Sequence, residues 1–187
     1  MPHSRIRYII FIIAAILQFF ITGCSSTGNE YPSPFLFYDF ESDKELDWLH
    51  WKCKTLMSLS DRHVSHGSKS LKLELFPSDY PGFNPALKNI DWNNYSKLCF
   101  EIYNPEKSEQ RLCIRIDDRV DNPEYNDRYN SSVILKRGMN YIEIELDSII
   151  TSGTERKLEI QNITKLLLFM VNPPEKITLY LDYLRLV

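Results

Sequence analysis

Short segments in which apolar and polar residues alternate one by one are the feature that most constrains the fold of this chain. The pattern occurs at 71–75, 98–103, 112–117, 142–146 and 177–182. Successive side chains of a β-strand point to opposite faces, so each segment predicts a strand with one buried face. Further strands are expected at 36–40, 56–60, 133–135 and 166–171. No long segment keeps the spacing of an amphipathic helix, and the sequence therefore predicts an all-β protein.

Eight or nine short strands with polar connections favour a β-sandwich of the jelly-roll type. The chain has 187 residues, of which 43% are hydrophobic and 13% aromatic. That composition argues against a disordered chain, because disordered chains are poor in both classes. The formal net charge of −3 argues against a nucleic-acid-binding protein, which would carry a basic surface.

The first 24 residues have the pattern of an export signal. Arg5 and Arg7 precede an apolar run at 8–20, interrupted only by Gln18. This run is shorter than a membrane-spanning helix, which needs about 20 residues. The ending Ile-Thr-Gly-Cys at 21–24 resembles the lipobox of bacterial lipoproteins. The resemblance implies that the Cys24 sulfur is lipidated; an uncleaved helical anchor or an ordinary export signal is the alternative.

Three regions follow from this interpretation. They are a lipoprotein signal peptide at 1–23, a lipidated Cys with a flexible, Pro-containing tether at 24–34, and a β-sandwich binding domain at 35–187. Ser25, rather than an aspartate, follows Cys24. The lipoprotein resemblance therefore implies a lipid-anchored protein of the cell envelope, in the outer membrane if the organism is diderm.

Five segments, taken in order, resemble the galactose-binding-like β-jelly-roll family of carbohydrate-binding modules. They are FYDFE at 37–41, HVSHGSKSLKL at 63–73, DWNNY at 91–95, FEIYNP at 100–105 and LYLDYLRL at 179–186. Together they span nearly the whole predicted domain. The resemblance implies the fold and a carbohydrate ligand, although one fold can serve many functions.

The same resemblance implies a structural Ca²⁺ between the first and last strands. Its ligands would be Glu41, a backbone carbonyl in the turn near 67–69, and Asp182. Calcium takes six to eight oxygen ligands, and carboxylates from the two ends of the chain fit that chemistry. The alternative is that both acids are ordinary surface groups, or that they pair with Arg185 or a lysine.

A hairpin of 97–103 with 111–117 would place Glu101, Tyr103, Arg115 and Asp117 on one outer face. Cys99 and Cys113 would share that face, and a disulfide between them is feasible if the register sets them opposite each other. The alternative is a solvated face with a Glu–Arg pair across the strands.

The candidate ligand-binding residues lie on this face and in two loops. Carbohydrates are held by flat aromatic surfaces and by planar polar groups. Tyr80 and Phe83 are the candidate stacking residues, Arg115, Asp117, Tyr125 and Arg128 the polar contacts, and Glu101 and Tyr103 the floor. The alternative for Arg128 is a salt bridge with Asp117 or Asp118 that only fixes the loop.

The leading hypothesis is a membrane-anchored, non-catalytic carbohydrate-binding lipoprotein. A second hypothesis is a structural or assembly lipoprotein of the envelope that binds a protein partner through the same face. The third is a small polysaccharide hydrolase or lyase with a carboxylate pair drawn from Asp117, Asp118, Asp127 or Glu143. The sequence contains no Gly-x-Ser-x-Gly, phosphate-loop or HExxH motif, so catalysis has the weakest support.

Overall fold

The computed structural model describes residues 33–50 and 53–187. The signal peptide predicted for 1–23, the lipidation site at Cys24 and most of the tether lie outside the described residues. In the part that the model describes, no helix is long and apolar enough to cross a membrane.

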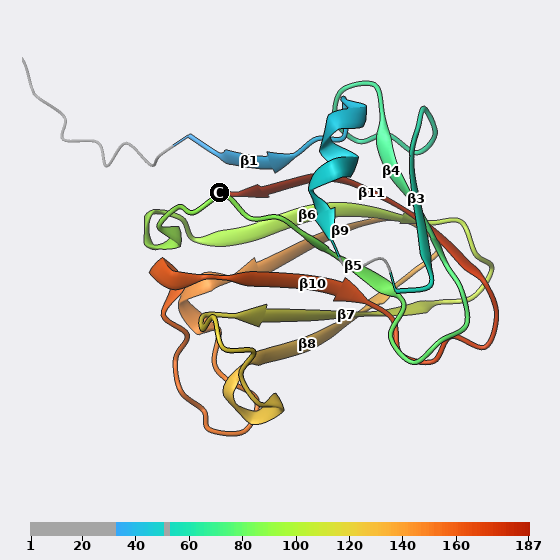
Figure 1. The fold of residues 1–187 in the computed structure, drawn as a ribbon. Helices are drawn as coiled ribbons and strands as arrows, with labels where there is room; N and C mark the ends of the chain where they lie inside the picture. Colours follow the sequence, from blue (N-terminus) through green and yellow to red (C-terminus); the bar gives the residue numbers. More distant parts are fainter. Residues whose placement is uncertain (1–32, 51–52) are drawn as a thin grey trace, which may run out of the picture. The chain divides into compact units, whose positions relative to one another are not determined.

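Two antiparallel sheets form the two layers of a β-sandwich (Figure 1). The six-stranded sheet has the order β3 (Thr55–Ser60), β4 (Ser70–Leu75), β11 (Ile177–Leu186), β6 (Lys97–Asn104) and β9 (Gly138–Glu145), and β1 (Phe35–Tyr38) also pairs with β11. The five-stranded sheet has the order β2 (Leu49–His50), β5 (Gly82–Pro85), β10 (Lys165–Phe169), β7 (Gln110–Asp117) and β8 (Tyr129–Leu135). The predicted all-β jelly-roll sandwich is confirmed.

Short 3₁₀ helices occupy the connections. They are η1 (Asp43–Trp48), η2 (Trp92–Asn94), η3 (Tyr125–Asp127), η4 (Leu146–Ser148) and η5 (Ile160–Asn162). A capping box starts η1, because Ser42 accepts from a backbone N–H of the first turn and Glu45 accepts from the Ser42 N–H. Asp91 caps η2 by accepting from the Asn93 N–H at 2.9 Å.

The core lies between the inner faces of the two sheets. Phe100 of β6 and Ile114 of β7 belong to it, together with the other inward residues that the alternation predicts for these strands. They meet across the layers, however, because β6 pairs with β11 and β9 while β7 pairs with β10 and β8. The predicted hairpin of these two segments is therefore wrong.

The connection between β6 and β7 carries the chain from one sheet to the other. The buried Asn104 side chain fixes this crossing by donating to the carbonyl oxygens of Ser108 and Leu135 at 3.1 and 3.0 Å. The outward residues of β6 and β7 consequently lie on opposite outer faces of the sandwich. Cys99 and Cys113 are both free thiols, and the feasible disulfide between them does not form.

A β-bulge interrupts β11 near its end. The register with β6 shifts between Asp182 and Arg185, and Tyr183 has a φ of 52°. Leu181 and Leu184 both reach the core although they are three residues apart. The bulge therefore leaves two consecutive residues, Asp182 and Tyr183, on the outer side of the six-stranded sheet.

Candidate ligand-binding groove

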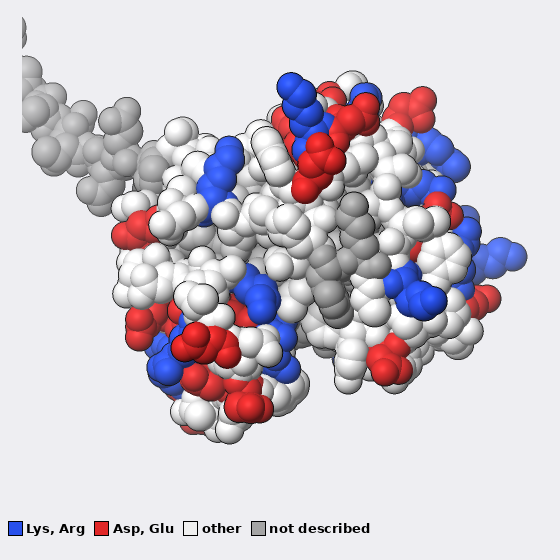
Figure 2. Space-filling view, viewed as in Figure 1, with Lys and Arg blue, Asp and Glu red and all other residues white. Residues whose placement is uncertain are grey.

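A groove of about 850 Å³ runs across the outer face of the five-stranded sheet. The surface is hollowed below β10 and β7 in Figure 2. Leu167 and Phe169 of β10 form an apolar floor. In the strand register they lie beside Arg115 and Cys113 of β7, which line the groove as well. This outer row explains why β10 is apolar after Lys165: Leu166 and Leu168 face the core, and Leu167 faces the groove.

Gly82 makes room for the apolar floor. It pairs with Phe169, and a Cβ atom at this position would lie 2.6 Å from the Phe169 Cα. Any larger residue would push β5 away from β10. Tyr80, just before β5, packs edge-on against the Phe169 ring at a centroid distance of 6.1 Å.

Two tyrosines stand at opposite flanks of the groove. Tyr80 precedes β5 and is 51% exposed, while Tyr125 precedes β8 and is 64% exposed. Exposed aromatic rings that border a hollow can pack their faces against a bound molecule. The two rings are therefore available to stack against a bound molecule.

A buried ion pair supports the centre of the groove. Arg115 donates to both carboxylate oxygens of Asp117, at 2.8 and 2.6 Å, and to Asn122 Oδ1 at 2.9 Å. The Asp117 side chain is 0% exposed and lies beneath the groove. Lys165 Nζ approaches the same carboxylate at 3.7 Å. This fork geometry fixes the Arg115 guanidinium and leaves its outer edge facing the groove.

The structure brings together four of the predicted ligand-binding residues. Tyr80, Arg115, Tyr125 and Arg128 all line the groove. Arg128 pairs with neither Asp117 nor Asp118; its guanidinium lies 5.4 Å from the Tyr125 ring centroid. The salt-bridge alternative for Arg128 is therefore wrong.

Two predicted contacts lie close to the groove but are not exposed to it. Phe83 is completely buried in the core, because its neighbour Gly82 takes the outward position on β5. The expectation that Phe83 is a stacking residue is therefore wrong. Asp117 serves as the buried partner of Arg115 and is not available as a direct contact.

The predicted floor residues Glu101 and Tyr103 are on the opposite side of the molecule. They belong to β6 in the six-stranded sheet, so their placement in the groove is wrong for the same reason as the hairpin. Glu101 accepts from Arg185 at 3.0 Å and from the Ser65 hydroxyl at 3.2 Å. Tyr103 stacks on the His63 ring at a centroid distance of 3.7 Å.

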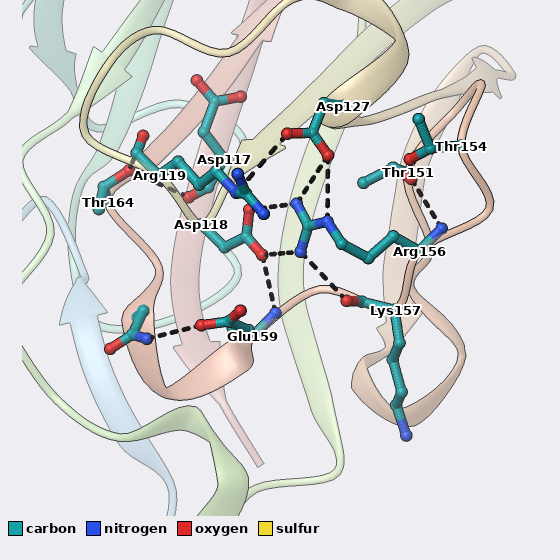
Figure 3. A network of polar contacts seen from close by, with 11 residues as sticks. Asp117, Asp118, Arg119, Asp127, Thr151, Thr154, Arg156, Lys157, Glu159 and Thr164 are labelled. Atoms are coloured by element: carbon teal, nitrogen blue, oxygen red, sulfur yellow. Dashed lines mark hydrogen bonds and ion pairs between the residues drawn. The ribbon is translucent and has the colours of Figure 1, made fainter.

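An ionic network that the sequence did not reveal fixes the loop carrying Tyr125 and Arg128 (Figure 3). Arg156 donates to both oxygens of Asp118, at 2.6 and 3.0 Å, and to Asp127 Oδ1 at 3.0 Å. Burial acts to raise the pKa of Asp118, but the bonds from Arg156 and the Glu159 N–H outweigh it and lower that pKa. Figure 2 shows acidic and basic atoms intermixed over these loops.

The donor set around the expected calcium ligands does not fit a hard cation. Glu41 accepts from the Ser68 N–H and hydroxyl and from the Lys69 N–H, which together lower the pKa of Glu41 to about 2. Asp182 accepts from the N–H groups of Ser65 and His66 at 2.8 and 2.9 Å.

Calcium needs oxygen ligands, whereas the turn 65–69 presents N–H and O–H donors to both carboxylates. Burial raises the pKa of Asp182 against the lowering effect of these N–H donors. In the described residues, no group of three or more acidic, histidine or cysteine side chains could hold a metal ion. The Ca²⁺ site therefore stays a prediction, and the geometry offers it no support.

The two packed sheets and the groove on one of them define a jelly-roll β-sandwich of the kind found in carbohydrate-binding modules. No protein-family model and no curated protein sequence matches the chain. Several solved structures do.

An exo-beta-agarase has a TM-score of 0.67 and 16% identity over 82% of this chain, which corresponds to only 25% of the agarase chain. The family 11 carbohydrate-binding module from Clostridium thermocellum, in complex with a beta-1,3-1,4-mixed-linked tetrasaccharide, has a TM-score of 0.63 and 16% identity, with 82% of this chain and 95% of the module covered. The module CBM27-1 of Caldicellulosiruptor saccharolyticus, in complex with mannohexaose, has a TM-score of 0.55 and 14% identity, with 82% and 96% covered. At these identities the likeness establishes the fold.

Proposed function

We propose that the groove of the five-stranded sheet binds a glycan. The observation that carries this proposal is the combination, in one hollow of about 850 Å³, of two exposed tyrosines and an apolar floor. Sugar rings present apolar C–H faces that pack on such surfaces and hydroxyls that bond to planar polar groups. Arg115, Asn84 and Asn130 supply those groups along the groove. The similar modules bound to oligosaccharides support the same interpretation.

Binding, rather than hydrolysis, is the chemistry that the groove favours. Its lining among residues 33–50 and 53–187 contains no carboxylate side chain, and the buried Asp117 is already committed to Arg115. A pair of free carboxyl groups is what most glycoside hydrolases need. We therefore propose a non-catalytic role.

The binding domain would act at the surface of a membrane. The lipobox-like ending at Cys24 supports lipidation of its sulfur, and the polar segment 24–34 would serve as a tether. We propose that the protein is held in the cell envelope, in the outer membrane if the organism is diderm, where it would keep a glycan close to the lipid.

A glycan panel tests the proposed function. Retardation of the protein in gels containing neutral and acidic polysaccharides should identify a ligand, and calorimetric titration should then give its affinity. Tyr80→Ala and Tyr125→Ala should each weaken binding at least about fivefold, because truncating an aromatic anchor commonly costs more than 1 kcal/mol. The failure of every glycan to bind the folded protein would refute the proposal.

Tyr141→Ala is the matched control. Tyr141 is 73% exposed on β9, in the six-stranded sheet, and does not line the groove. Its substitution removes the same ring from the opposite side of the sandwich, and affinity should stay unchanged. Equal losses in all three variants would place the binding surface elsewhere.

A further inference from the structure

The groove is strongly basic, although the whole chain is acidic. Four cationic side chains line it, namely Arg111, Arg115, Arg128 and Lys165. No acidic side chain of the described residues does so. The formal net charge of the chain is −3, so this local excess of positive charge opposes the overall charge. Clefts with one sign of charge concentrate ligands of the opposite sign.

A single buried carboxylate compensates part of this charge. Asp117 is shared between Arg115, at 2.6 Å, and Lys165, at 3.7 Å. Four cations and one carboxylate leave an excess of about three positive charges in and beneath the groove. Glu124 acts on Arg128 from the neighbouring loop and favours its charged form, but it does not line the groove.

Arg128 forms neither a salt bridge nor a side-chain hydrogen bond within residues 33–50 and 53–187. Its Nε atom is buried and has no hydrogen-bond partner within the described part of the chain. Burial, together with repulsion from the nearby Arg115, lowers the pKa of Arg128 below the usual value for arginine. A buried guanidinium donor without an acceptor is costly, and a carboxylate or sulfate bound to the outer N–H groups of the same guanidinium would offset part of that cost.

Arg111 extends the basic line along β7. It lies two positions from Cys113 and four from Arg115, so alternation places all three on the groove side of the strand. Within the described part of the chain, the Arg111 side chain forms one hydrogen bond, which it donates to the neutral Ser132 hydroxyl at 3.1 Å. No carboxylate in 33–50 or 53–187 forms a salt bridge with it.

We propose that the glycan held in this groove is acidic, with carboxylate or sulfate groups along its chain. This inference rests on the proposed glycan-binding function and adds the charge class of the ligand. Tyr80 and Tyr125 stack on the sugar rings, while Arg128 and Arg111 bind the anionic substituents. Arg115 is held by Asp117 and contributes the edge of its guanidinium. Guanidinium groups suit these anions because they bind two oxygens at once.

A matched pair of ligands separates charge from sugar identity. Galacturonic acid hexamer and its carboxyl-reduced galactose hexamer share one backbone and differ in their carboxylates. Sulfated galactan oligosaccharides and their desulfated products form the second pair, which distinguishes sulfate from carboxylate. Titration of the intact protein at 50 and 300 mM NaCl should give about tenfold or tighter binding of the acidic member in at least one pair, and this preference should shrink as salt rises.

Two groove variants and one control localise the effect. Arg128→Gln and Arg111→Gln should each lose about fivefold or more in affinity for the acidic ligand and should lose clearly less in affinity for its neutral partner, so that the preference for the acidic member shrinks. Arg137→Gln removes the same charge from an exposed position that does not line the groove, and should change neither. Circular dichroism should confirm that all three variants are folded.

The outcomes distinguish this inference from the function on which it rests. If the panel of polysaccharides and the two pairs yield only neutral ligands, the acidic assignment is overturned and glycan binding stands. If no glycan binds, the proposed function fails and takes the assignment with it. If Arg137→Gln weakens acidic binding as much as Arg128→Gln, the preference belongs to the general surface, and the assignment to the groove is overturned.

Discussion

Three of the four groove residues that the sequence predicted lie outside the strands, and the fourth, Arg115, lies on β7, where alternation gave its face correctly. Tyr80, Tyr125 and Arg128 flank strands, so their exposure did not depend on the phase of a strand. Phe83 lies within β5, and one residue decides its direction. Gly82 takes the outward position, because β5 must approach Phe169 closely, and Phe83 therefore turns into the core. A period-2 pattern in a four-residue strand is too short to reveal this phase.

His63 predicts a dependence of stability on pH. Burial, and then the charge of Arg62, lower the pKa of His63 below its ordinary value near 6.5. Its Nε2 atom is buried without a partner among the described residues, and its ring stacks on Tyr103. The unfolded chain therefore binds a proton near pH 6.5 that the folded chain resists, so the stability from neutral His63 is full above that pH and decreases as the pH falls below it.

Thermal melts at pH 5.0 and 7.5 test this prediction. The wild-type protein should lose more stability at pH 5.0 than His63→Phe, which keeps an aromatic ring against Tyr103 but cannot take a proton. An identical pH dependence in both proteins would contradict the role of His63. The comparison of two chains removes the contribution of the other titrating groups.

Glu41 predicts the response to metal removal. Its carboxylate accepts three hydrogen bonds from the turn at Ser68 and Lys69. It packs so closely against Gly67 that no side chain would fit at that position. If these bonds are the whole function of Glu41, EDTA should leave the melting temperature unchanged and Glu41→Gln should lower it. A melting temperature that rises with CaCl₂, and no longer does so in Asp182→Ala, would instead establish the calcium site.

At the scale of elements, alternation predicts the face of a strand but not its partner. The inward residues of β6 and β7 were predicted correctly, and both sets are in the core. Their assignment to one hairpin failed because the loop after Asn104 crosses between sheets. Sequence neighbours usually pair, but in a sandwich they can also face each other across the core. The wrong placement of Glu101 and Tyr103 in the groove follows from the predicted hairpin alone.

The bulge in β11 was visible in the sequence in a different form. Ile177, Leu179 and Leu181 occupy odd-numbered positions, whereas the apolar residues Leu184 and Leu186 occupy even-numbered positions. A change of phase inside one strand predicts an inserted residue, and the structure places it at Asp182–Tyr183. The ionic network of Arg156 left no comparable signal, because it joins loops that are 29 to 38 positions apart.

Arg156 predicts a positioning effect on the groove. It connects the loop at 151–159 to Asp118 and Asp127, on either side of Tyr125. Arg156→Gln should loosen the segment 118–130, which carries Tyr125, without removing any group from the groove. Hydrogen exchange should therefore speed up at 118–130, and glycan affinity should fall about three- to tenfold. Lys157→Gln, at the next and exposed position, is the control.

The readouts separate positioning from a general loss of stability. Amide exchange in β4 and β11, on the far side of the core, should stay as slow as in the wild type. If Arg156→Gln speeds exchange throughout both sheets, Arg156 stabilises the whole sandwich rather than this loop. Unchanged exchange at 118–130 would show that the network does not fix it.

At the scale of the whole molecule, the two outer faces differ in chemistry. The five-stranded sheet presents a basic, aromatic groove, and the six-stranded sheet presents Glu101, Arg185 and the His63–Tyr103 stack, which are largely satisfied by one another. The hollow that combines cationic side chains with exposed rings lies on the first face. The proposed lipid anchor would let the protein turn this face toward a polymer that lies along the membrane surface.

The proposed lipid anchor also predicts a gain in binding strength. A single groove that offers two tyrosine rings and a few cationic side chains would bind a glycan weakly. Many copies on one surface can bind the same polysaccharide chain at once, which raises the apparent affinity by about two orders of magnitude or more. The full chain should partition into Triton X-114 and retain its glycan on membrane vesicles, whereas Cys24→Ser should remain in the aqueous phase and release the glycan quickly. Both proteins should bind a short oligosaccharide equally, since the groove is unchanged. Partition of Cys24→Ser into detergent as complete as that of the wild type would contradict lipidation at Cys24, and equal retention of the polysaccharide would contradict the gain from clustering.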